Sequence, residues 1–382
     1  MIKENELYFI KKLCSVPSFN GRLGIDIINH FGSAENLFSA DEKTLASLLK
    51  PSMFKNLMKA DYEDKDNHYS FVSIYDEEYP LILKKISDPP LGFWYYGKLP
   101  DKKLPSVAVI GARDCSDYGA YIAKTIGTYL AKSGVQVISG LARGIDGIAQ
   151  RAALDSGGYS AAVLGSGVDI CYPASNLDTY EKLKKDGCII STYKPGTKAL
   201  PINFPPRNRI VSGLCDAVIV IEARQKSGTL ITVDMALEQG REVFAVPGRI
   251  TDRLSDGCNA LIGQGANVFL SPEIFLCELS ELFEAKKEGE YHPKTGHFKP
   301  LQLSEDTKKK HRGFSGNEEN LDISGEEKKV LESLSLSPIT ADELSLKLPE
   351  FDYATLSMLL MQLLIDGHIS QIGQGSYVRV FK

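Results

Sequence analysis

Short apolar segments alternate with longer amphipathic ones between residues 107 and 246. The alternation predicts β-strands at 107–110, 135–139, 161–165, 188–191, 217–222 and 242–246, and helices at 118–132, 146–155, 175–185 and 229–239. Successive parallel strands must be joined by crossovers, so strands that alternate with helices form a mostly parallel sheet with helices on both faces. The sequence therefore predicts an α/β domain.

The rest of the chain divides into segments of different character. Residues 1–65 read as a helical domain, 66–285 as the sheet domain with a short aromatic strand region at 72–99, 286–325 as a polar linker, and 326–382 as three helices followed by a hairpin turning at Gln374–Gly375. A length of 382 residues also predicts two or three domains. Three helices and a hairpin are typical of a winged helix.

Neither flanking segment has a strong DNA-binding signature. The first two N-terminal helices resemble a helix-hairpin-helix unit, but their turn, Ser18–Gly21, lacks the usual pair of glycines, which favours a structural role. The third C-terminal helix would read a DNA groove in a winged helix, yet residues 353–366 contain no Lys or Arg. Packing or protein contact is the favoured role there.

Composition excludes several classes of protein. Hydrophobic residues make up 43% and charged residues 24% of the chain, as in ordinary globular proteins, and no apolar run reaches 18 residues, so we expect no membrane insertion. The N-terminus does not read as a signal peptide. The seven cysteines are scattered without a CxxC, which argues against a disulfide framework and a zinc site and favours the reducing cytoplasm. A net charge of −5 still permits a local basic groove for nucleic acid.

Glycines and cations gather where the predicted strands end, which is where open parallel sheets bind ligands. Glycine allows a ligand close to the backbone, helix N-termini offer N–H donors to phosphate, and arginines neutralise anions. The candidate residues are Gly111, Arg113, Ser139, Gly140, Arg143, Gly165, Arg207, Asn208, Arg209, Lys226, Ser227, Gly228, Thr229 and Gly248. An anionic ligand is expected. The alternative is that the arginines pair with Asp146, Glu222 and Asp234 inside the fold.

Known catalytic motifs are missing from these loops. The first strand is followed by GARDCSDYG instead of GxGxxG, no GxxxxGK[ST] occurs, and none of the six histidines falls in a predicted strand-end loop. Asp146 begins a helix and reads as an N-terminal cap or dipole partner. The sequence therefore favours binding over catalysis, with neither a metal nor a cofactor.

Seven segments in this order closely resemble the bacterial DNA-processing protein A family (DprA, also called Smf). They are VAVIGARDCSDYG, VISGLARGID, AVLGSGVDICYP, FPPRNRIVSGL, VIVIEARQKSGTLIT, REVFAVPG and GCNALIGQGA, within about residues 75 to 270. The resemblance implies an extended Rossmann-like domain that binds single-stranded DNA, forms a homodimer and delivers the strand to the RecA recombinase during natural transformation. Two departures are Ala149-Gln150, where the family often has a histidine, and Thr192, where it often has an acidic residue.

The resemblance also assigns roles to residues. Arg207, Asn208 and Arg209 match the family's RNR signature at the rim of the strand-end groove, where the two arginines and Arg113 would neutralise phosphates. Gly140, Gly228 and Thr229 would let backbone amides approach phosphate, so binding is expected to be largely independent of sequence. The expected dimer contact is the apolar set Leu261, Ile262, Val268 and Phe269.

Two other functions remain open at this point. One is a nucleotide hydrolase of the phosphoribohydrolase type, which Glu222, Asp234 and Glu238 keep in view. That family's PGGxGTxxE loop is absent, and Thr232 stands where its glutamate would fall. The other is a scaffold that binds protein partners and no DNA.

Overall fold

Two compact units make up the protein. The computed structural model describes residues 4–63, 68–288, 325–334, 339–366, 368–372 and 376–379. One unit comprises Met1–Cys115 and Ile122–Gly296, the other Ser116–Tyr121 and His297–Lys382. Each has its own hydrophobic core. No helix within the described ranges combines the length and apolarity needed to cross a lipid bilayer.

The first unit is built on a nine-stranded sheet with the order β1-β2-β6-β5-β4-β3-β7-β8-β9. Its strands are β1 (Ser70–Ser73), β2 (Gly92–Gly97), β3 (Ser106–Ile110), β4 (Gln136–Ser139), β5 (Ser160–Val163), β6 (Cys188–Ser191), β7 (Ala217–Val220), β8 (Glu242–Ala245) and β9 (Asn267–Val268). The strands from β6 to β9 are parallel, whereas β1 and β2 add an antiparallel edge. The six predicted strands and the mostly parallel sheet are confirmed.

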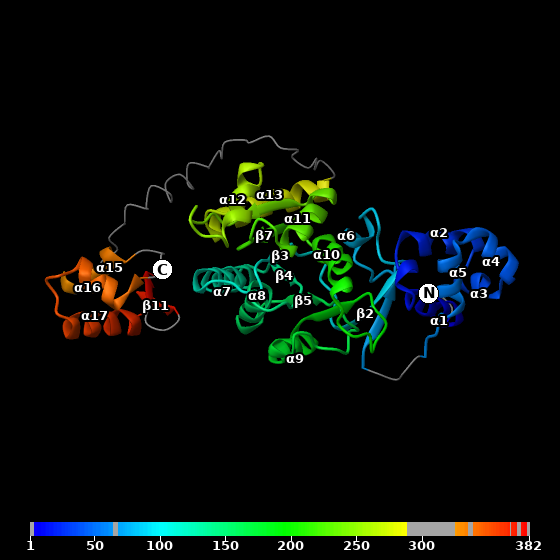
Figure 1. Ribbon diagram of the computed structural model, residues 1–382, viewed down its shortest axis with the longest axis horizontal. Coiled ribbons are helices and arrows are strands. Elements are labelled where there is room, and N and C mark those ends of the chain that lie inside the picture. Colours follow the sequence, from blue (N-terminus) through cyan, green and yellow to red (C-terminus); the bar gives the residue numbers. More distant parts are fainter. Residues whose placement is uncertain are drawn as a thin grey trace. The chain divides into compact units, whose positions relative to one another are not determined.

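Helices cover both faces of this sheet (Figure 1). The helices α7 (Asp117–Lys132), α8 (Ile145–Asp155) and α9 (Leu177–Asp186) join β3, β4, β5 and β6, which run in one direction across the sheet. The chain then crosses back through α10 (Phe204–Gly213) and continues through α11 (Gly228–Glu238) and α12 (Asp256–Gly263) toward β9 and α13 (Pro272–Glu288). Parallel crossovers are right-handed, so the two directions place their helices on opposite faces. The four predicted helices are confirmed.

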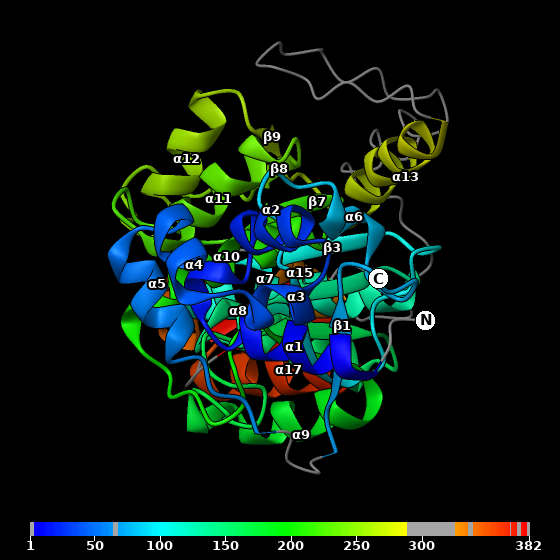
Figure 2. The ribbon, with the colours of Figure 1, turned by 90° about the vertical axis from the view of Figure 1, so that its right-hand side faces the viewer.

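The described N-terminal residues form five helices, of which α1 packs against β1 and β2 at the antiparallel edge of the sheet. They are α1 (Glu4–Cys14), α2 (Arg22–Phe31), α3 (Ala34–Ser39), α4 (Glu42–Leu48) and α5 (Pro51–Met58), and they face the viewer in Figure 2. Leu13 and Phe19 belong to the same buried cluster as Phe93 and Trp94 on β2. The N-terminal helices therefore share one core with the sheet.

The turn between α1 and α2, which resembled a helix-hairpin-helix turn, is occupied by the protein itself. Phe19 is buried, and the Asn20 side chain donates to the Thr192 carbonyl (2.8 Å) and accepts from the Gly92 N–H (3.2 Å). The backbone N–H of Arg22 donates to the Asp88 carboxylate (2.6 Å). This turn joins the helices to the sheet, which agrees with the structural role favoured from its sequence.

Between residues 325 and 379, the described part of the second unit contains three helices and a three-stranded antiparallel sheet. The order along the chain is α15 (Gly325–Ser333), β10 (Ile339–Thr340), α16 (Ala341–Lys347), α17 (Tyr353–Ile365), β11 (Ile369–Ile372) and β12 (Ser376–Arg379). Its core includes Leu344, Leu356, Leu360 and Leu363. Most of the predicted linker, residues 289–324, and the predicted hairpin turn at 374–375 lie outside the described residues.

Candidate functional site

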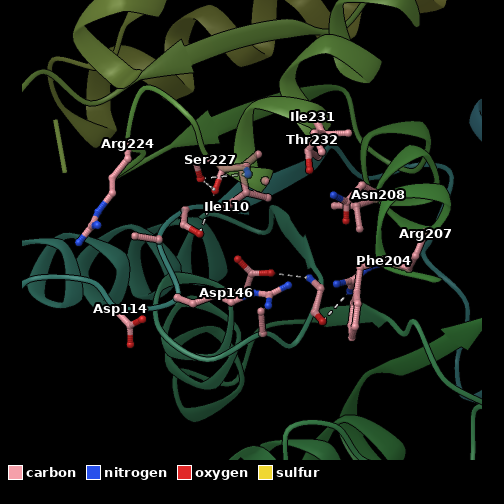
Figure 3. Close-up of a pocket in the computed structure, with 18 of the residues that line it drawn as sticks. Ile110, Asp114, Asp146, Phe204, Arg207, Asn208, Arg224, Ser227, Ile231 and Thr232 are labelled. Atoms are coloured by element: carbon pink, nitrogen blue, oxygen red, sulfur yellow. Dashed lines mark hydrogen bonds between the residues drawn. The ribbon is translucent and has the colours of Figure 1, made fainter. Parts of the chain in front are cut away.

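A cavity of about 480 Å³ lies at the carboxyl ends of β3, β4 and β7. The chain leaves β3 for α7 on one face of the sheet and leaves β7 for α11 on the other, so the two connections diverge and leave a crevice between them. The loops after these strands line the cavity together with the first turns of α10 and α11 (Figure 3). This is the strand-end position that the sequence predicted.

The start of α11 presents bare backbone to the cavity. Ser227 caps the helix by accepting from the Thr229 N–H (3.2 Å), and the Thr229 hydroxyl donates to the Gly111 carbonyl (3.2 Å). A Cβ built on Gly228 would meet no heavy atom within 4 Å, and its φ lies outside the left-handed region, so the fold itself does not require glycine there. The positive end of the α11 dipole is thus open to an anion.

Helix α10 contributes Phe204, Arg207 and Asn208 to the cavity wall. Arg207 is only 4% exposed, and its Nη1 donates to the carbonyl oxygens of Gly140 (2.6 Å) and Val163. Its Nε has no hydrogen-bond partner among the described residues. Burial lowers the pKa of Arg207 to about 10, which still leaves it charged at neutral pH. Arg207 therefore ties the ends of β4 and β5 together while it charges the cavity.

Two cations approach the Phe204 ring. The guanidinium carbon of Arg113 is 5.4 Å from the ring centroid and that of Arg207 is 5.7 Å from it. Both distances are within the range of cation–π attraction. The result is a flat apolar surface beside two positive charges.

The loop after β4 is held by two side chains from α8. The buried Asp146 carboxylate accepts from the Gly140 N–H (3.1 Å), and the Gln150 side chain accepts from the Leu141 N–H (2.9 Å). Burial raises the pKa of Asp146. The charge of Arg207 and the hydrogen bonds that Asp146 accepts act in the opposite direction. Asp146 and Asp114 are therefore the two carboxyl groups in a lining whose other ionisable residues, Arg113, Arg207, Arg224 and Lys226, are cations.

Arg209 does not line the cavity. It forms an ion pair with Asp88, and its Nη2 donates to the Asn20 carbonyl (3.4 Å). Residues two positions apart on an α-helix point about 200° apart around its axis, so Arg207 and Arg209 reach opposite sides of α10. The structure separates the two arginines that the sequence analysis expected at one rim.

The structure brings together most of the other predicted residues. Those that line the cavity are Gly111, Arg113, Gly140, Arg207, Asn208, Lys226, Ser227, Gly228 and Thr229, and those outside the lining are Ser139, Arg143, Gly165, Arg209 and Gly248. The Ser139 hydroxyl donates to the Val109 carbonyl within the sheet (2.6 Å), and a Cβ on Gly165 would meet the Phe204 ring at 2.9 Å. These two positions have packing roles.

The alternative pairing of the arginines is met in part, because Arg207 and Asp146, one of the three expected partners, attract each other. Arg143 pairs with Asp114 and Arg209 with Asp88, neither of which was considered as a partner. The sequence analysis also did not assign the cavity residues Asp114, Phe204, Arg224 and Ile231 to the site. Phe204 and Arg224 lie inside the motifs FPPRNR and EARQKSGT, which also contain predicted site residues. This closeness in sequence could have indicated that they belong to the site.

Leu261 and Phe269, two of the four expected dimer residues, are buried in the core of the first unit. Ile262 and Val268 keep partial exposure, and Leu270 beside them is exposed. Of the four expected residues, Ile262 and Val268 therefore remain accessible to a partner.

Comparisons with known proteins agree with the resemblance in the sequence. The family model for DNA recombination-mediator protein A matches residues 70–280. The DNA processing protein DprA of Streptococcus pneumoniae is 38% identical over 288 residues, 72% of this chain and 98% of the relative, and that of Bacillus subtilis is 38% identical over 211 residues, 55% and 71%.

Two solved structures are similar as well. DprA from Streptococcus pneumoniae superposes with a TM-score of 0.61 at 36% identity, covering 73% of this chain and 99% of that one. DprA from Helicobacter pylori, described with a unique single-stranded DNA binding mode, has a TM-score of 0.51 at 30% identity, covering 56% and 97%. The chain belongs to the DNA recombination-mediator protein A family.

Proposed function

We propose that the cavity at the ends of β3, β4 and β7 binds the backbone of single-stranded DNA. The observation that carries this proposal is the open N-terminus of α11 beside the exposed cations Arg113, Arg224 and Lys226. Backbone N–H groups and cations together form a phosphate site, and exposed cations release counterions from DNA when they bind it.

Preference for a single strand follows from Phe204. Bases of a single strand are free to stack on an aromatic ring, whereas those of a duplex are already stacked and paired. The ring is partly exposed in the cavity wall, and the guanidinium carbon of the exposed Arg113 is 5.4 Å from its centroid, so a base that stacks on the ring brings its phosphates near that cation. The related protein from Helicobacter pylori, described as binding single-stranded DNA, supports this preference. Because every base has a flat face, the preference requires no particular sequence.

Binding of a labelled oligonucleotide at several salt concentrations tests the proposal. We expect the single strand to bind more tightly than the duplex. For the single strand, the logarithm of the binding constant should fall with the logarithm of the salt concentration, with a slope of about −0.7 for each phosphate that is neutralised. Arg113→Gln and Lys226→Gln should each weaken binding and make the slope shallower. Lys182→Gln, which removes an exposed lysine of α9 that is paired with Asp155, is the matched control and should change neither.

We also propose that the protein acts as a homodimer in the cytoplasm and passes incoming single strands to RecA during natural transformation. Family membership supports this, and the partly exposed Ile262 and Val268 and the exposed Leu270 are the proposed contact. RecA filament formation on a single strand, followed through its DNA-dependent ATP hydrolysis, should be faster when the protein is present. An unchanged rate would refute the RecA step alone.

The second unit is proposed to be a winged helix that contacts protein. Met358, Met361 and Ile365 are exposed along one side of α17, and the helix carries no lysine or arginine. Such a helix has nothing with which to neutralise phosphate.

The proposed action is binding without catalysis. Incubation with nucleoside monophosphates should therefore release no free base. Release of base would revive the phosphoribohydrolase alternative.

A further inference from the structure

Arg143 lies beside the candidate site and is paired with a neighbouring carboxylate. It lies in the loop after β4, next to the cavity residue Ala142, but it forms an ion pair with Asp114 and does not line the cavity. Asp114 itself lines the cavity from the loop after β3 (Figure 3). The two side chains are 63% and 77% exposed.

An exposed ion pair of this kind is weak. Such pairs contribute little because water screens both charges and two flexible side chains must be held together. A DNA phosphate is also an anion that accepts charge-assisted hydrogen bonds from a guanidinium group. Asp114 and a phosphate in the cavity would therefore compete for one cation on nearly equal terms.

We infer that Asp114 limits the affinity of the cavity for DNA by competing with phosphate for Arg143. The inference rests on the proposed function, since it needs a DNA backbone in the cavity. Asp114 acts through Arg143 and is a positioning residue: while the pair is intact, Arg143 contributes no phosphate contact. When Asp114 is neutral, Arg143 turns to the strand.

Asp114→Asn tests the inference because it removes the charge and keeps the shape. We expect single-stranded DNA to bind up to about fivefold more tightly, which is the upper value of an exposed ion pair. The salt dependence should become steeper by about 0.7, the contribution of one further phosphate contact. A variant that merely damaged the loop would bind more weakly, so a gain in affinity separates competition from a structural role.

Asp155→Asn provides the matched control. Asp155 also pairs with a cation in an exposed ion pair, that of Lys182, and does not line the cavity, so its replacement changes the net charge by the same amount. We expect no comparable gain from it. Arg143→Gln in the Asp114→Asn background should abolish the gain, while Arg143→Gln alone should have little effect.

Three results would overturn the inference. They are an unchanged or weaker affinity of Asp114→Asn, an equal gain in Asp155→Asn, and a gain that persists when Arg143 is absent, which would indicate simple repulsion by Asp114. If the wild-type protein binds no single-stranded DNA at all, the proposed function fails first. Wild-type binding with no gain in Asp114→Asn refutes the competition alone.

Discussion

Replacing Arg207 with methionine should destabilise the protein strongly. The change keeps most of the side-chain volume but removes the donor to the buried carbonyls of Gly140 and Val163 and the cation that attracts the buried Asp146. Two hydrogen bonds from a charged donor and the stranded carboxylate give an expected loss of about 3–5 kcal/mol in the free energy of unfolding. That is a large part of the stability of a typical domain.

Urea denaturation measures this loss through tryptophan fluorescence. The single tryptophan, Trp94 on β2, is fully buried in the first unit and reports on its unfolding. The midpoint should fall by about 1 M urea or more while the slope m stays constant, because the same surface is exposed on unfolding.

Arg209→Gln is the matched control on the same helix. Its side chain is 20% exposed and its partner Asp88 is 48% exposed, so we expect a smaller loss of stability than for Arg207→Met, and little change in DNA affinity because Arg209 lies outside the cavity. An unchanged midpoint for Arg207→Met would refute the reasoning, since the guanidinium would then be a ligand for phosphate and no part of the scaffold.

Three further predictions concern the cavity and the assembly. Burial holds the pKa of Asp146 above its ordinary value, so the folded protein takes up this proton at higher pH than the unfolded chain does. The contribution of Asp146 to stability is therefore present at low pH and is lost as pH rises through the pKa of the folded state. Protonation also removes a negative charge from the cavity, so DNA affinity should rise as pH falls through that pKa, and titration of Asp146→Asn should show a flatter pH profile than wild type. Gly228→Val should unfold at nearly the wild-type temperature but bind DNA more weakly, because the space around Gly228 is open to a ligand and free of protein atoms; a loss of melting temperature would show that the glycine is structural. Ile262→Glu should shift sedimentation from twice the 42.0 kDa subunit mass toward the single subunit; a wild-type protein that sediments only as a monomer at micromolar concentration would contradict the proposed dimer.

The sequence allowed the sheet to be predicted because buried parallel strands are short apolar runs separated by helices of regular length. The ends of those runs located the cavity, since ligand-binding loops of an open sheet follow its strands. The orientation of each side chain could be predicted less well from the sequence. The segment FPPRNR indicated a helical turn, but only its packing shows that Arg207 faces inward and Arg209 faces Asp88.

Long-range contacts account for the other differences. Ser139 follows its strand and resembles a ligand residue, yet its hydroxyl is used by the Val109 carbonyl on the neighbouring strand. The core that joins Leu13 to Trp94 was also not predictable, because the apolar face of a helix does not identify the surface that it covers. Residues distant in sequence decide both features.

Photo-crosslinking with a single-stranded oligonucleotide that carries 5-iododeoxyuridine tests the central claim most directly. The iodinated base reacts with an aromatic side chain that lies against it, and mass spectrometry identifies the modified peptide. If the strand lies in the cavity, the adduct should form on Phe204, and excess unlabelled single strand should suppress it more effectively than excess duplex. Adducts confined to aromatic residues outside the cavity lining, such as Tyr353 on α17, would place the DNA elsewhere and contradict the account.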